Sequence, residues 1–327
     1  MTSNAAWSDV LPLVRSLFPA TRLVRSAELS RVLGTDVHLK LECELPTGSF
    51  KVRGAYVALR AATERGDVRE VVAASTGNHG AAVAWAARAL GIAARIFVPV
   101  GANRTKTTRI ESLGARLSEV GADIEGSRRA AEAYAAASGA FLLDDATSPD
   151  VPFGAGTIGL ELIEQLSDVA TVVVPVGDSA LVRGVAGAIE SVRRDVRIVG
   201  VQAVTAPAYH DSWRSGRVEP TETANTIADG LATTTPTAPN VAAIRALVDD
   251  MVLVSDAEMI DAMRVLREHD GVVAEPAGAA PVAALRGGAS ASVVGPVVAI
   301  VTGGNVAPEI EARAWPGMAH ARLEVSS

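Results

Sequence analysis

The pattern that decides the fold is the stretch Val71-Val72-Ala73-Ala74-Ser75-Thr76-Gly77-Asn78-His79-Gly80. Its first part, Val71–Ala74, is a short apolar run with the length of a buried strand. A polar loop with two glycines follows it directly. An alanine-rich segment then runs over Ala81–Leu90 and ends at Gly91, a residue that favours the end of a helix. The stretch therefore predicts a strand, a loop and a helix in that order.

The same alternation continues along the chain. Further helices are expected at Thr105–Leu113 and Asp123–Ala137, and further strands at Ala94–Pro99, Arg116–Val120, Thr171–Val176, Arg197–Gln202, Met251–Val254 and Val297–Val301. Several of these strands are nearly continuous runs of β-branched residues, as expected where helices cover both faces of a sheet. Alternating strands and helices predict an α/β fold with mostly parallel sheets.

Composition excludes some classes of protein. The chain has 327 residues, with 30 lysines and arginines against 37 aspartates and glutamates, a net charge of −7. This balance argues against a general nucleic-acid binder, which needs a basic face. The single cysteine, Cys43, excludes an internal disulfide and a cysteine-rich zinc site, so a reducing, cytoplasmic setting is expected.

One stretch needs a test for membrane insertion. Gly287–Pro308 contains no charged residue and is long enough to span a bilayer. It is rich in glycine, however, and its apolar centre, Val297–Val301, has only the length of a strand. We therefore expect a buried strand followed by a glycine loop, and no membrane partner.

A lysine segment carries the first candidate chemistry. A Pro-Thr-Gly-Ser turn at Pro46–Ser49 runs into a predicted helix, with Lys51 about one turn inside it, between Phe50 and Val52. Apolar surroundings disfavour the charged form of a lysine, so such an amine can act as a base or a covalent nucleophile. Taken alone, Lys51 could equally be a solvated lysine whose stem covers apolar neighbours.

Three further segments lie between a strand and a helix or at a strand end. Ser75–His79 could bind an anion through backbone N–H groups at a helix N-terminus, although Ser75 or Thr76 could simply cap that helix. Gly177–Leu181 could offer N–H groups to a phosphate. Thr302–Asn305 directly follows the last expected strand, Val297–Val301. Each segment alone could be a tight turn.

Together, these segments resemble the serine/threonine dehydratase group of fold-type II pyridoxal-phosphate enzymes. That group carries Thr-Gly-Ser-Phe-Lys-x-Arg-Gly-Ala, matched at Thr47–Ala55, and Ser-x-Gly-Asn-His, matched at Ser75–His79. Further matches are Gly156–Glu161, Thr226–Gly230, Glu275–Ala279 and Gly303–Asn305. The resemblance implies two domains, each a mostly parallel twisted sheet flanked by helices. We expect a large domain over 1–68 and 148–327 that binds the cofactor, and a small domain over 69–147 that binds the substrate carboxylate.

The resemblance also implies roles for individual residues. Lys51 would bind pyridoxal phosphate covalently, Asn78 would meet the 3-hydroxyl of its ring, and the hydroxyl of Thr302 would meet the pyridine nitrogen. The implied cofactor set is Phe50, Lys51, Asn78, Gly177, Asp178, Ser179, Ala180, Leu181, Gly230, Glu275 and Thr302. The implied set for the substrate carboxylate is Ser75, Thr76, Gly77, Asn78 and His79. Lys51 and Thr76 are the candidate catalytic residues.

Two departures from the family pattern matter. The phosphate loop is usually four glycines followed by leucine, whereas this chain has Gly177-Asp178-Ser179-Ala180-Leu181. Asp178 should point away from a phosphate or orient the loop, because like charges repel. Racemase-like relatives place carboxylates after the strand that matches Arg197–Gln202. Here Gln202–Ala208 has none, so no divalent metal is expected.

The resemblance implies a lyase that converts a β-hydroxy-α-amino acid to a keto acid and ammonia in amino-acid catabolism. Threonine, serine, 3-hydroxyaspartate, phenylserine and specialised analogues are all open. A racemase is an alternative, because the hydroxyl of Thr76 could return a proton. A β-replacement synthase is a further alternative, but such enzymes usually have threonine at the position of His79, which disfavours it. A non-catalytic binding protein is disfavoured by the presence of Lys51. Homodimerisation is implied by the family alone.

Overall fold

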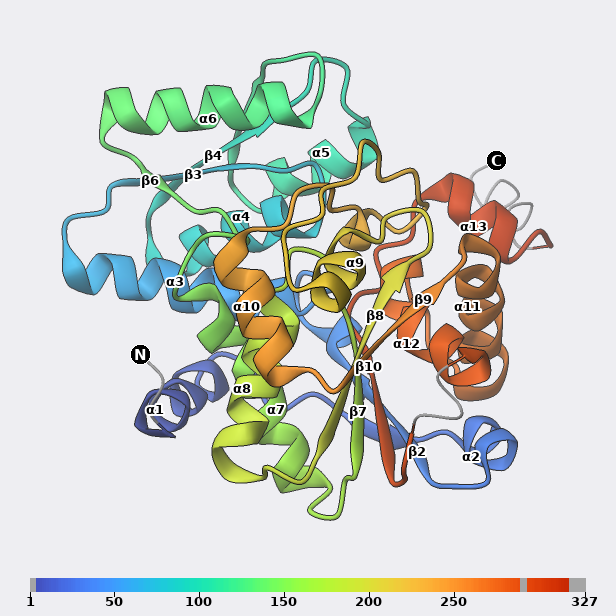
Figure 1. Cartoon of the computed structure of the whole chain (residues 1–327). Coiled ribbons are helices and arrows are strands. Elements are labelled where there is room, and N and C mark those ends of the chain that lie inside the picture. The colour runs from blue at the N-terminus through green and yellow to red at the C-terminus, as the bar shows by residue number, and fades with distance from the viewer. Residues whose placement is uncertain (1–3, 289–292, 318–327) are drawn as a thin grey trace. The chain divides into compact units, whose positions relative to one another are not determined.

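The computed structural model describes residues 4–288 and 293–317 (Figure 1). Contacts between Cα atoms divide it into two compact units. The first comprises the chain up to Pro19 together with Leu45–Ile158, and the second comprises Ala20–Glu44 and the chain from Gly159 onward. Each unit contains one sheet flanked by helices, and every strand pair but one is parallel within the described ranges. The predicted α/β fold is confirmed.

The first unit is built on a four-stranded parallel sheet of order β5-β4-β3-β6. Its elements are α1 (Asn4–Arg15), α3 (Lys51–Arg65), β3 (Glu70–Ala74), α4 (Asn78–Leu90), β4 (Ala93–Val98), α5 (Arg104–Ser112), β5 (Arg116–Glu119), α6 (Ile124–Ser138), β6 (Phe141–Leu142) and α7 (Val151–Gln165), whose last turns belong to the second unit. Figure 1 shows α6 on one face of this sheet and α4 on the other.

Local sequence explains where these helices begin and end. The carboxylate of Asp123 accepts a hydrogen bond from Gly126 N at 2.7 Å and so caps the start of α6. Gly91 ends α4 in the left-handed conformation, at φ +69°, and its N–H donates to the last turn. Helix α4 begins at Asn78, earlier than the apolar pattern predicts. The polar residues Asn78 and His79 therefore lie in its first turn.

The second unit is built on a six-stranded sheet of order β1-β2-β10-β7-β8-β9, in which only the β1–β2 pair is antiparallel. Its elements are β1 (Leu23–Arg25), α2 (Ala27–Leu33), β2 (Val37–Leu41), the 3₁₀ turn η1 (Glu42–Glu44), β7 (Thr171–Pro175), α8 (Ala180–Val192), β8 (Arg197–Ala203), α9 (Ala208–Ser215), the 3₁₀ turn η2 (Asp229–Leu231), α10 (Ala238–Leu247), β9 (Asp250–Val254), α11 (Asp256–Asp270), α12 (Pro276–Arg286), β10 (Val297–Val301) and α13 (Pro308–Ala314). Strand β10 pairs with β2 in the register Val297 to Val37.

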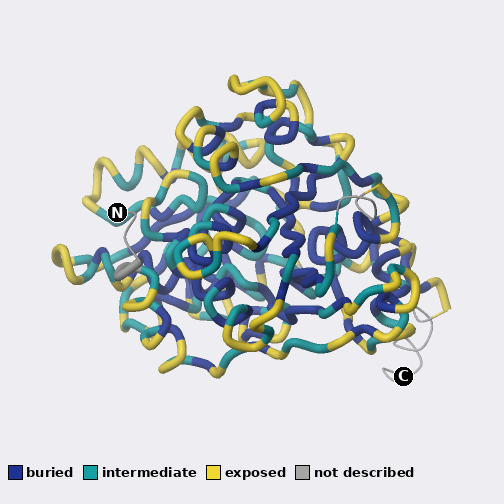
Figure 2. Tube along the Cα trace, turned by 60° about the horizontal axis from the view of Figure 1, so that its bottom comes forward, coloured by how far each residue is buried: buried dark blue, intermediate teal, exposed yellow. Residues whose placement is uncertain are grey.

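The core of the second unit lies around its central strands. Every residue of β7 and β10 is buried, which accounts for their almost entirely apolar sequences. In Figure 2 such buried stretches are dark blue and alternate with exposed turns in yellow. Helix α12 consists mainly of small residues and packs against β7, β8, β9 and β10. A Cβ atom at Gly278 would lie 2.5 Å from the carbonyl oxygen of Gly303, so α12 approaches the loop after β10 closely.

Strand β2 contains a buried charge. The side chain of Lys40 is fully buried, and its Nζ donates to Glu161 Oε2 at 2.7 Å. It also donates to Gln165 Oε1 at 2.8 Å and to the carbonyl oxygen of Thr21 at 2.9 Å. A buried ammonium group is tolerated when it is paired and its hydrogens are satisfied, as they are here.

The small domain expected over 69–147 encloses all four strands of the first sheet. The first unit contains α1, α3 and the first part of α7 in addition to that sheet. The bounds of the two domains stay a prediction. Strand β10 coincides with the expected strand, and residues 289–292 of the uncharged stretch lie outside the described residues. Within 4–288 and 293–317, no helix has both the length and the apolar character needed to cross a membrane.

Candidate active site

In the first unit, Lys51 lies at the start of α3. The structure makes it the first helical residue, so it is not one turn inside the helix as the sequence predicted. Gly48, at φ +61°, forms the preceding turn, and the N–H of Lys51 donates to Ser49 Oγ at 3.2 Å. This hydroxyl thus accepts a hydrogen bond from one of the backbone N–H groups that have no partner within the helix at its start. The side chain of Lys51 is 18% exposed, so its amine is largely shielded from water.

Close packing fixes the first turns of α3. The guanidinium of Arg53 is fully buried and donates to Thr157 Oγ1 at 2.9 Å. A Cβ atom at Gly154 would lie 2.4 Å from the carbonyl oxygen of Arg53, so the two helix backbones touch there. The Thr47–Ala55 and Gly156–Glu161 segments are thus explained in part by how α3 and α7 pack.

The amine of Lys51 contacts a carboxylate that the sequence analysis did not single out. Its Nζ forms an ion pair with Oδ2 of Asp145, which lies in the loop after β6. The same Oδ2 atom lies 3.4 Å from Nδ1 of His79. The other ring nitrogen of His79, Nε2, lies 2.9 Å from the carbonyl oxygen of Leu143. Because a carbonyl oxygen can only accept, Nε2 carries a hydrogen and the orientation of the ring is fixed.

The Ser75–His79 segment comprises the loop after β3 and the first two residues of α4, Asn78 and His79. Gly77 is the N-cap residue of α4, and no side chain caps the helix there. The alternative that Ser75 or Thr76 caps it is therefore wrong. Instead, Ser75 Oγ accepts from the N–H of Gly77 at 3.1 Å. Among the described residues, nothing lies within 4 Å of the position that a Cβ atom of Gly77 would take. The start of α4 thus has unfilled space beside its backbone, where an anion could approach.

In the second unit, Gly177–Leu181 runs from the loop after β7 into the first turn of α8. A Cβ atom at Gly177 would lie only 2.0 Å from the carbonyl oxygen of Gly230, so the backbones of η2 and of the loop after β7 nearly touch there. Ser179 adopts the left-handed conformation, at φ +82°, which favours glycine. The Asp178 carboxylate accepts from the N–H of Ala180 at 3.0 Å. Asp178 therefore orients the loop, one of the two roles that were expected.

Three side chains that the sequence analysis gave no role brace this loop. Arg183 Nε donates to Ser179 Oγ at 3.0 Å, and burial lowers the pKa of Arg183. Tyr209 donates its hydroxyl hydrogen to the carbonyl oxygen of Asp178 at 3.2 Å. Asn240 in turn donates to the Tyr209 hydroxyl, also at 3.2 Å. An arginine keeps its charge even when its pKa falls, so a guanidinium lies beside the loop.

The remaining predicted residues also belong to the second unit. Gly230 lies in η2, where a Cβ atom would come 3.0 Å from Cβ of Ala277. Glu275 is the N-cap residue of α12, and its N–H donates to the carbonyl oxygen of Gly303 at 2.9 Å. Thr302 is buried directly after β10. The structure therefore brings Gly177 together with Gly230, and Glu275 together with the loop after β10.

These features fit pyridoxal phosphate. A shielded lysine amine suits its aldehyde. The start of a long helix, α8, together with the guanidinium of Arg183, suits its phosphate. The buried hydroxyl of Thr302 suits the polar nitrogen of its ring.

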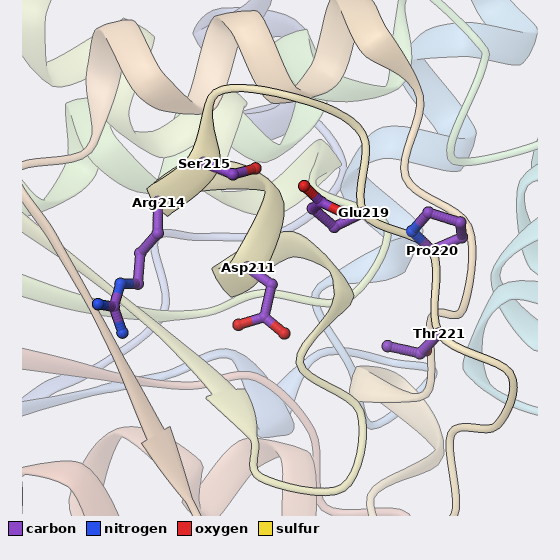
Figure 3. A pocket seen from close by; sticks show the side chains of 6 residues that line it. All are labelled: Asp211, Arg214, Ser215, Glu219, Pro220 and Thr221. Carbon is purple, nitrogen blue, oxygen red and sulfur yellow. The ribbon is translucent and has the colours of Figure 1, made fainter.

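Other candidate chemistry is weaker. Burial raises the pKa of the Cys43 thiol to about 12, so Cys43 is not a candidate nucleophile. Across the described part of the chain, no three His, Cys, Asp or Glu side chains are grouped so as to hold a metal ion. A depression of about 530 Å³ lies beside α9 (Figure 3). It contains none of the predicted site residues and is lined by Asp211, Arg214, Ser215, Glu219, Pro220 and Thr221.

Comparisons with known proteins agree with this geometry. A family model described as pyridoxal-phosphate dependent enzyme matches residues 14–303. The chain is 41% identical to the L-threonine ammonia-lyase of Thermotoga maritima over 294 residues, which are 90% of this chain and 73% of that protein. It is 34% identical to the catabolic L-threonine dehydratase of Escherichia coli over 288 residues, 88% of each chain.

Solved structures show the same relationship. Maize serine racemase superposes with a TM-score of 0.90 at 29% sequence identity, with 99% of each chain covered. The processed form of a threonine deaminase from Solanum lycopersicum superposes with a TM-score of 0.90 at 27% identity, covering 95% of this chain and 86% of that one.

Proposed function

The chain belongs to the family of pyridoxal-phosphate-dependent enzymes, and from this premise we propose that it is an ammonia-lyase for a β-hydroxy-α-amino acid, with L-threonine as the first candidate. The resemblance drawn from the motifs is confirmed. The observation that carries the proposal is the setting of Lys51, whose shielded amine is linked through Asp145 to His79 of the Ser75–His79 loop. The names of the relatives support the reaction class.

The cofactor is pyridoxal phosphate. When bound, it accepts the electrons that remain when the bond between Cα and its hydrogen breaks. Lys51 would hold its aldehyde carbon, and Asn78 would donate to its 3-hydroxyl. The phosphate would be held by backbone N–H groups of Gly177–Leu181, with Arg183 supplying a positive charge. Phe50, Gly230, Glu275 and Thr302 complete the proposed set.

This chain's own residues supply binding and proton transfer. The Ser75–His79 loop holds the substrate carboxylate with hydroxyl and N–H groups. Lys51 Nζ takes the proton from Cα, after which the β-hydroxyl leaves, and hydrolysis of the product yields a keto acid and ammonia. A hydroxyl at Thr302 cannot act as a charged partner for the pyridine nitrogen. This favours prompt elimination over reactions that need a long-lived carbanion.

A racemase is the second candidate. Thr76 lies in the loop between β3 and α4 and carries a hydroxyl that could return a proton to Cα. The similarity to maize serine racemase over the full chain supports this alternative. Chiral chromatography of recovered amino acid distinguishes the two, because only inversion at Cα converts L-serine to D-serine, or L-threonine to D-allothreonine, without loss of amino acid.

We also propose that the enzyme is a cytoplasmic homodimer. The single cysteine, Cys43, suits a reducing compartment. Light scattering coupled to size-exclusion chromatography tests the dimer, since a monomer would elute with a mass near 33.6 kDa. Cell fractionation tests the compartment.

The main experiment assays the purified holoenzyme with L-threonine, L-serine and further β-hydroxy amino acids. We expect equal amounts of keto acid and ammonia. Lys51→Ala should lower the rate by roughly 10²–10⁴-fold or more and should abolish covalent retention of the cofactor after borohydride reduction. A holoenzyme that produces no keto acid from any of these substrates, or a K51A variant with full turnover, would contradict the proposal.

A further inference from the structure

Asp145 is a charged residue of the first unit to which the proposed mechanism assigns no role in binding or proton transfer. We propose that it determines specificity by charge, so that the site accepts neutral or cationic substrate side chains and rejects acidic ones. The inference rests on the proposed function and narrows its substrate class. It removes 3-hydroxyaspartate from the candidates and retains threonine and serine.

Three segments bring Asp145 to its place. Its Oδ2 contacts Lys51 Nζ at the start of α3 and lies 3.4 Å from His79 Nδ1 in the first turn of α4. The Asp145 side chain is 19% exposed, similar to the 18% of Lys51, so both groups are shielded but reachable. The carboxylate therefore lies directly at the nitrogen that the proposal assigns to the reaction.

The neighbouring turn holds Asp145 in this position. Oδ1 of Asp144 accepts from the N–H groups of Ala146 and Thr147 and from the Thr147 hydroxyl, each at 3.0 Å. This closed turn fixes the backbone on the C-terminal side of Asp145. His79, fixed by its contact with Leu143, limits movement on the other side. A carboxylate held in this way cannot swing far from an unfavourable neighbour.

Cofactor binding changes the charge balance around Asp145. Lys51 must be an uncharged amine when it takes the proton from Cα, so at that stage Asp145 no longer faces a full positive charge. His79 is positively charged only when protonated on both ring nitrogens. The carboxylate then presents its negative charge to the incoming amino acid.

The geometry of the reaction places the substrate side chain close to this charge. Lys51 Nζ must reach the hydrogen on Cα, and the substrate's side chain begins one bond further on. A carboxylate on that side chain would come within several ångströms of Asp145. Two like charges at about 6 Å, in a medium of effective dielectric constant 20–40, disfavour binding by roughly tenfold to hundredfold.

The test compares L-aspartate with L-asparagine, which have the same shape and differ by one charge. Their binding to the holoenzyme is measured from the change in the absorption of the bound cofactor. The wild-type enzyme should bind L-asparagine at least about tenfold more tightly, and Asp145→Asn should bring the two affinities to within about threefold. In parallel, kcat/KM for 3-hydroxyaspartate relative to L-threonine should rise by the same factor.

Asp144→Asn is the matched control. It removes the same charge one residue away, and its side-chain oxygen can still accept the hydrogen bonds with which Asp144 closes its own turn. We expect D144N to keep the wild-type preference for asparagine over aspartate. If D145N folds poorly, Asp145→Ser serves in its place, with Asp145→Glu as the variant that keeps the charge and the preference.

Two outcomes would overturn the inference. One is a wild-type enzyme that binds aspartate as tightly as asparagine. The other is a D145N variant whose ratio of affinities equals that of the wild type. Failure of the proposed function looks different. For a holoenzyme that turns over no β-hydroxy amino acid, the affinities for L-asparagine and L-aspartate could still be measured. Their ratio would test the role of Asp145 independently of the proposed function.

Discussion

Gly177→Ala should displace the loop between β7 and α8, although it adds only a single methyl group. That methyl would lie 2.0 Å from the carbonyl oxygen of Gly230, whereas ordinary van der Waals contact begins at 3.4 Å. Neither partner is a flexible side chain, so one backbone segment must move by more than an ångström. Because the same loop supplies the N–H groups proposed to hold the cofactor phosphate, the movement should weaken cofactor binding as well as stability.

The magnitude follows from the closeness of this contact. Overpacking of this kind costs about 1–3 kcal/mol in the free energy of unfolding. A similar loss on cofactor binding corresponds to a roughly 5- to 150-fold higher Kd. Equilibrium dialysis against pyridoxal phosphate measures the affinity. Urea unfolding followed by circular dichroism measures the stability.

Gly66→Ala is the matched control for this variant. Among the described residues, nothing lies within 4 Å of the position that its Cβ would take, and its φ of −176° is extended backbone that any residue adopts. We expect G66A to bind the cofactor normally and to be as stable as the wild type or slightly more so. A G177A variant with wild-type affinity and stability, or a G66A variant with equal losses, would refute the reasoning.

The remaining predictions concern binding, stability and reactivity. Gly77→Ala has room within the protein and should fold normally, but it should raise KM for the substrate several-fold if the carboxylate approaches this backbone; an unchanged KM would contradict that role. Arg183→Met should weaken cofactor affinity by roughly tenfold in equilibrium dialysis while secondary structure is kept. Glu161→Gln removes the carboxylate that lies 2.7 Å from the buried amine of Lys40 and should lower the free energy of unfolding by about 3–5 kcal/mol, whereas replacing both residues by apolar ones should recover most of the loss in urea unfolding. Cys43 should react slowly with iodoacetamide at pH 8 in the folded enzyme and rapidly after unfolding, because its pKa is raised from 9.0 to about 12. For the same reason, stability should fall as the pH rises from about 9 towards 12, where the unfolded thiol loses its proton and the folded one keeps it.

Strands buried on both faces were predictable from sequence alone, whereas a buried charge concealed strand β2. Val297–Val301 is a continuous apolar run, and the structure reproduces its bounds. Strand β2, Val37–Leu41, contains Lys40 and was not predicted, since a lysine normally faces water. Its burial depends on partners such as Glu161, which is far along the chain. No local pattern reveals such a pairing.

The candidate site was likewise predictable only in part. Its glycines and its lysine stand in short segments whose residue types identify them, and the structure gives Gly177 a physical reason to be glycine. Asp145 was missed because 94 positions separate it from Lys51. Arg183 stands just beyond the Gly177–Leu181 segment, and only the folded loop reveals its contact with Ser179. Asp145 could be seen in the sequence as an acidic loop residue, but its partner could not.

The pairing of β2 with β10 bears on how the protein is made. Val37–Leu41 leaves the ribosome early, but its neighbour Val297–Val301 is among the last strands to be synthesised. The six-stranded sheet therefore cannot be completed during most of translation. Until β10 is synthesised, the edge of β2 that pairs with it is exposed, and strands of other chains could pair with that edge. The four-stranded sheet, whose strands all lie between Glu70 and Leu142, has no such delay. Ribosome-bound nascent chains should thus become protease-resistant first in this segment.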